Sequence, residues 1–423
     1  MFQKAYIWRM QQQSQPKHVL LIAYQFCPKG QIGTRRWSKF AKYLSGRGIR
    51  VSVLCARYPY RDKVNWCRDV EHDPNIEIHH LAPRYLSYLQ RPRRSWDVKL
   101  LDRLLSHTLY YLDKAQRWGG AWLPVARQLI EKENIRHVIV TGAPFTVMGQ
   151  AARLKQRLPG IRLLLDFRDP WSFRLPEETA FQRFRKKEAQ RTEQQALLHA
   201  DVALFTTRRM KEAYAEAYPD HRARLGVLRN GYDEDDFREL PAAGPASFRM
   251  VHAGALFGGR SEALKVLLEG ISRSEHPLVR DELQLHFFGN DFHPPGLTPD
   301  LQAIYDKKLV YHGPVPPRQL FEALRKFPFG LALNAPTHRN IILAKTFDYM
   351  GLGLRIFGIS PEGSLSDILQ QEGQYSVGFD PDAVCKALEQ AAEDFVTGQS
   401  GHQAYEAYNY NRLTDELLKW LEG

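Results

Sequence analysis

Cationic residues follow glycine-containing loops at two places where an apolar run gives way to a helical pattern. In the first, Cys27-Pro-Lys-Gly30-Gln-Ile-Gly33-Thr-Arg35-Arg36-Trp37 comes after the apolar run 19–24. Gly30 and Gly33 permit close backbone approach, and the helix that follows offers free N–H groups to an anion. The Gly-x-Gly-x-x-Gly fingerprint of nicotinamide cofactors is missing from this loop. The loop predicts an anion-binding turn, and an ordinary tight turn between strand and helix is the alternative.

The second place is Val251-His-Ala-Gly254-Ala-Leu-Phe-Gly-Gly-Arg260, which again leads from an apolar run into a helical pattern. Arg260 stands near the start of that helix. A guanidinium group beside free N–H groups suits a diphosphate. The alternative is a surface arginine beyond a turn.

A third segment follows the apolar run 329–333 and contains Asn340, Lys345 and Asp348. We expect a helix to begin near Asn340. Because Lys345 and Asp348 are three residues apart, they share one face of that helix. The ammonium group could meet a phosphate while the carboxylate accepts from sugar hydroxyls. A surface ion pair is the alternative.

A fourth segment, Asp166-Phe-Arg168-Asp169, comes directly after the apolar run 161–165. Open α/β sheets bind ligands at the carboxyl ends of their strands. Three charges in this position must face a cleft, water or one another. A structural pair between Arg168 and a carboxylate is the alternative.

Asp233 and Asp235, which follow Asn230-Gly231, have the spacing of an Asp-x-Asp metal site. Asn-Gly forms turns readily. We favour a solvated turn at the crossover between domains over a metal site.

The elements that must position these residues alternate between strands and helices, which is typical of a doubly wound α/β fold. Helices are expected at 37–44, from 145, and at 177–200. The expected strands are 19–24, 51–55, 137–140, 161–165 and 202–205 in the first half, and 249–252, 283–288, 309–311, 329–333, 355–357 and 375–377 in the second.

A chain of 423 residues is long enough for two domains. The segment 240–247 is rich in Pro and Gly and uncharged, so we expect it to be a linker. The predicted domains are therefore residues 1–240 and 241–400. The helical pattern in 401–423 is expected to cross back to the first domain.

The charge balance predicts an anionic partner. There are 59 Lys and Arg residues against 47 Asp and Glu residues, a net charge of +12, and the pI is about 9.4. Signatures of helix-turn-helix, RRM or zinc nucleic-acid binders are missing, so we expect no nucleic acid. No apolar run approaches the roughly 20 residues that span a bilayer.

The four cysteines have no Cys-x-x-Cys spacing, and Cys27 and Cys55 lie in apolar contexts. We expect reduced thiols in the core. The polar N-terminus lacks the apolar core of a signal peptide. Together these features predict a cytoplasmic location.

Basic and aromatic residues mix in segments 84–94 and 98–122, as they do in interfacial helices. Our hypothesis is peripheral docking on the anionic inner face of the cytoplasmic membrane. The alternative is an amphipathic helix packed on the first domain.

Taken in this order and spacing, the segments resemble the GT-B-fold, retaining glycosyltransferases of family 4 type, especially bacterial polysaccharide and O-antigen enzymes. The resemblance covers about residues 19–421. It is carried by the Gly-x-x-Gly-x-Arg-Arg-Trp loop, Asp-Phe-Arg-Asp-Pro-Trp, Asn-Gly-Tyr-Asp, the Gly254–Arg260 loop and Lys-Thr-Phe-Asp-Tyr-Met.

The resemblance implies two Rossmann-like domains facing across a cleft. It also implies transfer of a sugar from a nucleoside-diphosphate donor to a glycan or polyprenyl-diphosphate-linked acceptor during cell-surface polysaccharide synthesis. Arg260 and Lys345 would neutralise the donor diphosphate, so neither a metal nor another cofactor is expected. The implied donor-binding residues are Gly30, Gly33, Gly254, Arg260, Asn340, Lys345, Asp348 and Tyr349.

Two positions depart from the family pattern. Asp348 matches the second acid of the family's Glu-x7-Glu motif, but Asn340 stands where the first acid is expected. The family's first-domain histidine is replaced by the region of Arg168 and Asp169. Asp169 is therefore assigned to orient the acceptor or support the reacting centre, and Arg35 and Arg168 are assigned to the acceptor side.

Three other functions remain open at this point. The Asn340 departure permits a catalytically inactive GT-B scaffold subunit. A sugar-nucleotide epimerase would use the same fold, and the positive charge permits a basic nucleic-acid-binding protein.

Overall fold

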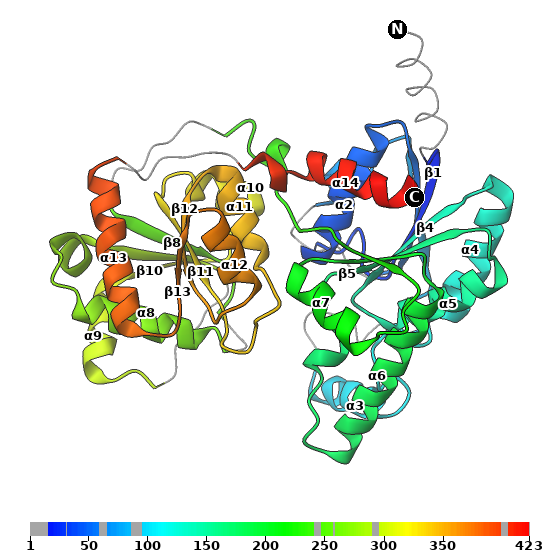
Figure 1. The fold of residues 1–423 in the computed structure, drawn as a ribbon, viewed down its shortest axis with the longest axis horizontal. Helices are drawn as coiled ribbons and strands as arrows, with labels where there is room; N and C mark the ends of the chain where they lie inside the picture. The colour runs from blue at the N-terminus through cyan, green and yellow to red at the C-terminus, as the bar shows by residue number, and fades with distance from the viewer. Residues whose placement is uncertain are drawn as a thin grey trace, which may run out of the picture. The chain divides into compact units, whose positions relative to one another are not determined.

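The computed structural model describes residues 16–30, 32–58, 66–85, 95–240, 247–256, 259–289, 296–398 and 405–422. The chain forms two compact units. The first is Met1–Arg229 with Leu413–Gly423, and the second is Asn230–Arg412. Each unit is a parallel sheet with helices on both of its faces (Figure 1). Two parallel-sheet, Rossmann-like units are what the alternating sequence pattern predicts.

The first unit contains a seven-stranded sheet in the order β3-β2-β1-β4-β5-β6-β7. All neighbouring strands pair in parallel, with Val19 of β1 opposite Val51 of β2 and His137 of β4. Apolar strands suit this arrangement, because helices cover both faces of the sheet. Its elements are β1 (His18–Ala23), α2 (Ile32–Ser45), β2 (Arg50–Ala56), η1 (Cys67–Asp69), β3 (Ile76–Leu81), α3 (Trp96–His107), α4 (Gly119–Glu133), β4 (His137–Gly142), α5 (Thr146–Arg157), β5 (Arg162–Phe167), η3 (Ser172–Arg174), α6 (Ala180–His199), β6 (Val202–Phe205), α7 (Arg208–Ala217) and β7 (Arg224–Val227).

A buried ion pair lies at the centre of the first unit. Asp166 is fully buried at the end of β5 and Arg36 on α2 is 2% exposed, and Arg36 Nη2 donates to Asp166 Oδ1 over 2.8 Å. Asp166 Oδ2 also accepts from Trp37 Nε1 at 2.7 Å and from Thr141 Oγ1 at 2.8 Å. Arg36 donates further to the carbonyl oxygens of residues 228 and 229, at 3.0 and 2.8 Å. One carboxylate and one guanidinium therefore join α2, β4, β5 and the segment after β7.

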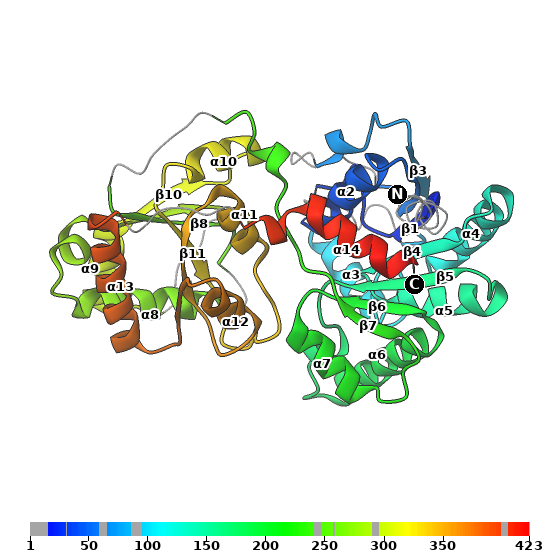
Figure 2. The same cartoon turned by 45° about the horizontal axis from the view of Figure 1, so that its top comes forward.

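The second unit contains a six-stranded parallel sheet in the order β10-β9-β8-β11-β12-β13. Figure 2 shows helices α8 and α13 together on one side of this sheet and α11 and α12 on the other. Its elements are η4 (Glu234–Asp236), β8 (Arg249–Ala253), α8 (Ser261–Arg273), η5 (Leu278–Glu282), β9 (Gln284–Phe288), α9 (Pro299–Lys308), β10 (Leu309–Gly313), α10 (Pro317–Leu324), β11 (Phe329–Leu333), α11 (Ala344–Leu352), β12 (Arg355–Ile359), α12 (Ser364–Gln371), β13 (Tyr375–Val377), α13 (Pro381–Val396) and η6 (Glu406–Tyr408).

The last helix, α14 (Tyr410–Glu422), belongs to the first unit from Leu413 onward. Its apolar face is buried through residues 413, 417, 418 and 421. The carbonyl oxygen of Trp420 accepts from Arg162 Nε and Nη2 at 3.2 and 3.0 Å. The Trp420 ring also fills the space in front of Gly226, where a Cβ atom would lie 2.4 Å from it. The end of the chain therefore completes the surface of β7.

The division between the units falls at residues 229 and 230, whereas the sequence placed it at 240. The expected linker at 240–247 lies mostly in residues 241–246, outside the described residues. The helix expected near Asn340 begins later, at Ala344, so Asn340 lies in the loop before it.

The expectation of reduced thiols is wrong for two of the four cysteines. Cys27, after β1, and Cys67, at the start of η1, form a disulfide with a Cα–Cα distance of 5.5 Å. Cys55 and Cys385 are free and buried, as expected. Spacing could not reveal the pair, because the two cysteines are 40 residues apart in the sequence and meet only when η1 returns to the loop after β1.

Within the described ranges, no helix is both long enough and apolar enough to cross a membrane.

We expect Asp166→Ala to lower the free energy of unfolding by about 3–5 kcal/mol, because it leaves a buried guanidinium group without its counter-charge. Urea denaturation followed by tryptophan fluorescence measures the change. Glu212→Ala is the control, because it removes one member of the exposed pair between Arg208 and Glu212. The control should leave the unfolding curve unchanged. Equal curves for the two variants would contradict a central role for the buried pair.

Candidate functional site

In the second unit, Lys345 and His252 are in direct contact. Lys345 is the second residue of α11 and His252 lies on β8, with Lys345 Nζ 2.7 Å from His252 Nε2. His252 is fully buried, and its Nδ1 is 3.0 Å from the carbonyl oxygen of Leu331. Because a carbonyl oxygen only accepts, Nδ1 carries the proton and Nε2 is left to accept from the ammonium group. His252 therefore fixes the direction of the Lys345 amine.

Arg260 lies close enough to this pair for its charge to matter. It is partly buried at the residue before α8. Burial, and after it the charge of Arg260, holds the pKa of Lys345 well below its usual range. Burial, then Lys345, holds the pKa of His252 well below its usual value, and Arg260 adds to that shift. Arg260 and Lys345 therefore lie near enough in the second unit for their charges to interact.

Gly254 leaves room for this arrangement. It directly follows β8 with φ +109°, and a Cβ atom there would lie 3.3 Å from Lys345 Nζ. Gly289, which follows β9, has φ +153° and packs against Gly254, where a Cβ atom would lie 2.6 Å from the Gly254 carbonyl oxygen. Both backbone positions require glycine. At the predicted glycine loop, the backbone therefore lies close to the Lys345 amine of the same unit.

The remaining predicted donor residues differ in their surroundings. Asp348 lies on α11, half-buried, and Asn340 lies half-buried in the loop that leads to it. Tyr349 is fully buried, and its hydroxyl accepts from the Ala253 N–H at 2.9 Å and donates to the Val251 carbonyl at 3.2 Å. The structure thus places Tyr349 in the core, where it ties α11 to β8.

In the first unit, Gly33 is the second residue of α2 and lies against Arg168. A Cβ atom at Gly33 would lie 1.8 Å from Arg168 Nη1. Arg168 donates through Nε to the Gly142 carbonyl and through Nη2 to the Ala143 carbonyl at 3.0 Å. The glycine therefore admits an arginine side chain that holds the end of β4.

The other predicted residues of the first unit lie at the same edge of the sheet or near it. Arg35 is 5% exposed, and its guanidinium lies 4.6 Å from the centre of the Trp66 ring. Gly30 lies half-buried between β1 and α2. Asp169 is half-buried after β5, and in the described part of the chain its carboxylate has no hydrogen-bond or ion-pair partner. That carboxylate is available to a ligand.

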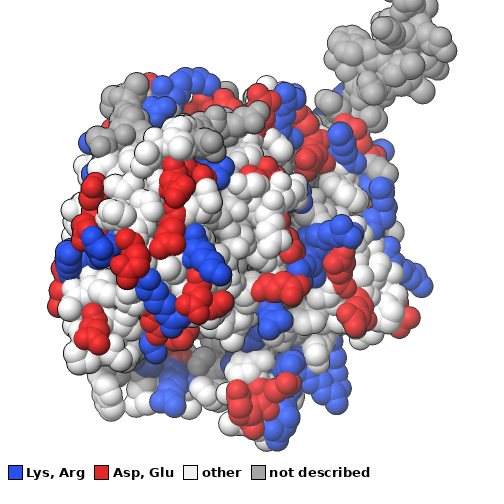
Figure 3. Space-filling model, turned by 60° about the vertical axis from the view of Figure 1, so that its left-hand side comes forward, with Lys and Arg blue, Asp and Glu red and all other residues white. Residues whose placement is uncertain are grey.

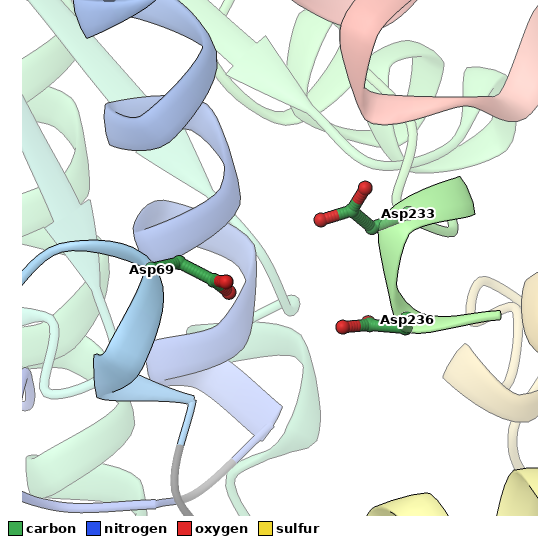
Figure 4. A group of neighbouring side chains, drawn as sticks. All are labelled: Asp69, Asp233 and Asp236. Carbon is green, nitrogen blue, oxygen red and sulfur yellow. The ribbon is translucent and has the colours of Figure 1, made fainter. Parts of the chain in front are cut away.

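The acidic residues around the crossover divide between the units. Figure 4 shows Asp233 and Asp236 on the segment of η4, in the second unit, and Asp69 at the end of η1, in the first. Asp233 is fully buried and accepts from the Asp235 N–H at 3.1 Å. Asp69 pairs with Lys39 Nζ at 2.7 Å. Asp235 pairs with Arg238, so Asp233 and Asp235 have the contacts of a capped turn.

His252 is the residue of this arrangement that sequence reasoning did not assign. It lies fully buried in the core of the second unit. The useful signal was its position two residues before Gly254, on the strand that leads into the Arg260 loop. Its partner Lys345 lies on a different element, α11, 93 residues away in the sequence.

Chemically, the second unit presents two cations at the carboxyl end of β8. Placing like charges together in a partly dehydrated position costs free energy, and a bound anion relieves that cost. Groups that are already in place when negative charge develops stabilise it without further reorganisation. The arrangement suits an anion such as a diphosphate.

Comparison with known proteins agrees with this fold. Residues 33–231 match the model of the glycosyl transferase 4-like domain. No curated protein sequence matches the chain.

Solved structures resemble the whole chain. A glycosyltransferase from Rickettsia africae is 11% identical, with a TM-score of 0.60 over 96% of this chain and 97% of its own. An E. coli trehalose-6-phosphate protein bound with UDP-2-fluoro glucose is also 11% identical, with a TM-score of 0.60 over 96% and 99%. The lipopolysaccharide outer core galactosyltransferase WaaB is 13% identical, with a TM-score of 0.55 over 95% and 98%.

At these identities the solved structures establish the fold, which is GT-B, while the domain match over residues 33–231 concerns the first unit. Together with the two parallel-sheet units, they show that the chain has the GT-B fold and that its first unit carries a glycosyl transferase 4-like domain.

Proposed function

We propose that this enzyme transfers a sugar from a nucleoside-diphosphate donor and that the second unit binds the donor diphosphate. The observation that carries the proposal is the contact of Lys345 with His252 beside Arg260. Two cations held at one place, one of them by a neutral buried histidine, form a preformed anion site. The similarity to a structure that contains UDP-2-fluoro glucose supports a nucleotide-sugar donor.

In the proposed reaction, the bond between the anomeric carbon and the diphosphate oxygen breaks, and that oxygen keeps the electron pair. The acceptor hydroxyl oxygen forms the new bond to the anomeric carbon and loses its proton. Lys345 and Arg260 stabilise the negative charge that develops on the diphosphate. Because two side chains supply this charge, the proposal requires neither a metal nor another cofactor. Retention of configuration is proposed from the resemblance.

The remaining assignments complete the proposal. Asp348 and Asn340 bind the nucleotide ribose or the sugar from the second unit. Asp169, with its available carboxylate, orients the acceptor from the first unit, while Gly33 and Arg168 shape that edge of the sheet. The acceptor is a glycan or a lipid-linked glycan used in cell-surface polysaccharide synthesis. The proposed site of action is the cytoplasmic face of the membrane.

The face drawn in Figure 3 does not favour the nucleic-acid alternative. Lys and Arg side chains there are interspersed with Asp and Glu side chains. Duplex binding uses basic residues gathered on one face.

Helix α3 supports docking on a membrane surface. None of its residues is buried, and Trp96, Leu100 and Leu104 are 77%, 53% and 60% exposed at helical spacing. Lys99 and Arg103, also exposed, form a neighbouring stripe. An apolar stripe beside a basic one suits the surface of an anionic bilayer. Most of the basic segment 84–94 lies outside the described residues.

A panel of nucleoside diphosphates and nucleotide sugars in a thermal-shift assay tests the donor. We expect the nucleotides of one base, and not the others, to raise the melting temperature of the protein. Lys345→Ala and Arg260→Ala should each weaken binding of that ligand by about 10- to 100-fold, because each removes a charge-assisted hydrogen bond worth about 1.5–3 kcal/mol.

Lys307→Ala is the matched control, because Lys307 is exposed on α9 of the same unit. Its shift should equal that of the wild type. Equal shifts in all variants would overturn the donor site. Turnover of the donor without an acceptor would favour an epimerase, and binding without any turnover would favour a scaffold.

His252 gives a second test of the same site. We expect His252→Leu to weaken nucleoside diphosphate binding by about tenfold, because the Lys345 ammonium group loses the acceptor that directs it. His252→Gln keeps an acceptor oxygen and should stay within a few-fold of the wild type. Isothermal titration calorimetry measures both. Equal losses in the two variants would mean that packing, rather than the hydrogen bond, is the role of His252.

Flotation with liposomes tests the membrane surface. Vesicles with anionic lipid should carry the protein upward at low salt and less so at high salt, because charge attraction is screened. Replacing Trp96, Leu100 and Leu104 by Ser should abolish flotation. Val396→Ser, at an exposed apolar position of the second unit, is the control. Flotation that neither salt nor the triple substitution changes would refute docking through α3.

A further inference from the structure

The sheet of the first unit changes winding direction at a point where open α/β sheets commonly bind ligands. In the order β3-β2-β1-β4-β5-β6-β7, this point lies between β1 and β4. Open α/β sheets bind ligands just outside the carboxyl ends of the two strands at such a point. Here those ends are Ala23 and Gly142.

Two lysines and two tyrosines gather beyond the end of β1. The Tyr24 and Tyr58 rings meet edge to face, with their centres 6.4 Å apart. Lys29 Nζ lies 4.8 Å from the centre of the Tyr58 ring, and Lys114 Nζ lies 5.9 Å from the centre of the Tyr24 ring. Lys29 is 7% exposed and Tyr24 is fully buried. The two ammonium groups therefore flank one pair of aromatic rings.

The Asp113 carboxylate, which precedes Lys114 in the sequence, is already occupied. Asp113 accepts from the N–H groups of Phe145, Thr146 and Ala115 at 2.8, 2.9 and 3.0 Å, and from the Thr146 hydroxyl. It therefore caps the start of α5 and fills the anion position that this helix would otherwise offer. Within the described ranges, the ammonium group of Lys114 has neither a hydrogen bond nor an ion pair.

The charge of Lys29 also acts on Lys114. Burial, and after it the charge of Lys29, lowers the pKa of Lys114 to about 8. A charged Lys114 beside a second ammonium group in a partly dehydrated place is unfavourable, and a bound anion would relieve that cost. Lys114 lies in the first unit, so the proposed donor site in the second unit does not explain this arrangement.

We propose that Lys29 and Lys114 form a phosphate subsite in the first unit, which holds a phosphate or diphosphate group of the acceptor. Ammonium groups are compact donors that bind phosphate as point charges. The subsite lies in a different unit from Lys345 and Arg260, so the two can be tested separately. Only the identification of the ligand as the acceptor rests on the proposed function; the binding of phosphate does not.

Inorganic pyrophosphate is the first probe, because it can occupy both phosphate sites. Isothermal titration calorimetry on the full chain should find two sites in the wild type and one in Lys345→Ala. In the Lys345→Ala background, Lys29→Met or Lys114→Met should raise the remaining Kd by about 10- to 100-fold, since each removes a charge-assisted hydrogen bond. Lys114→Arg keeps the charge and should stay within a few-fold of the parent.

Lys42→Met is the matched control, because Lys42 Nζ also lies 4.8 Å from a tyrosine ring centre, that of Tyr43, in the same unit. It should leave the Kd unchanged. The melting temperature without ligand should not fall in Lys114→Met, because Met removes a costly partly buried charge. Unchanged binding in both Met variants, or absence of any pyrophosphate site in Lys345→Ala, would overturn the subsite. If a Met variant melts at a lower temperature, an equal loss of pyrophosphate binding in Lys114→Arg would also overturn the subsite.

The outcomes separate the two proposals. Two sites in Lys345→Ala, one of which is lost in Lys114→Met, would support the subsite and refute the donor assignment of Lys345. A second probe, farnesyl diphosphate, distinguishes the source of the phosphate. Tighter binding than pyrophosphate in the Lys345→Ala background would indicate a lipid-linked acceptor, and equal binding would indicate recognition of the phosphate alone.

Discussion

The pair between Arg36 and Asp166 is the interaction on which the first unit depends. Both groups are buried, and they meet in a geometry that also satisfies Trp37, Thr141 and two carbonyl oxygens after β7. A buried ion pair is tolerated only when further hydrogen bonds complete it, and here they do. It fixes α2 against β4 and β5, and so sets the edge of the sheet where Gly33, Arg168 and Asp169 lie.

Each unit uses a glycine to admit a cation of its own. Gly33 makes room for the Arg168 guanidinium, and Gly254 makes room for the Lys345 amine. A loop rich in glycine after a strand is commonly interpreted as space for a ligand's phosphate. In this protein the space is already used by the Arg168 and Lys345 side chains. The glycines would therefore act on the proposed ligand sites through the cations beside them.

Most strands of both sheets could be predicted from the sequence, because central parallel strands are continuous apolar runs such as 202–205 and 329–333, whose bounds the structure reproduces. The edge strands β3 and β7 were missed, since their polar and half-exposed residues give no such run. The candidate site residues in the loops that follow the strands could also be identified from the sequence. Contacts between distant segments, such as His252 with Lys345 and Cys27 with Cys67, could not. Spacing along the chain carries no information about them.

The return of α14 to the first unit has a consequence for synthesis in the cell. Residues 413–422 follow the whole second unit in the sequence, yet they cover β7 and accept the hydrogen bonds of Arg162. The first unit therefore cannot be completed until the second unit has been synthesised. Until then, the surface beside Gly226 lacks the tryptophan side chain that covers it.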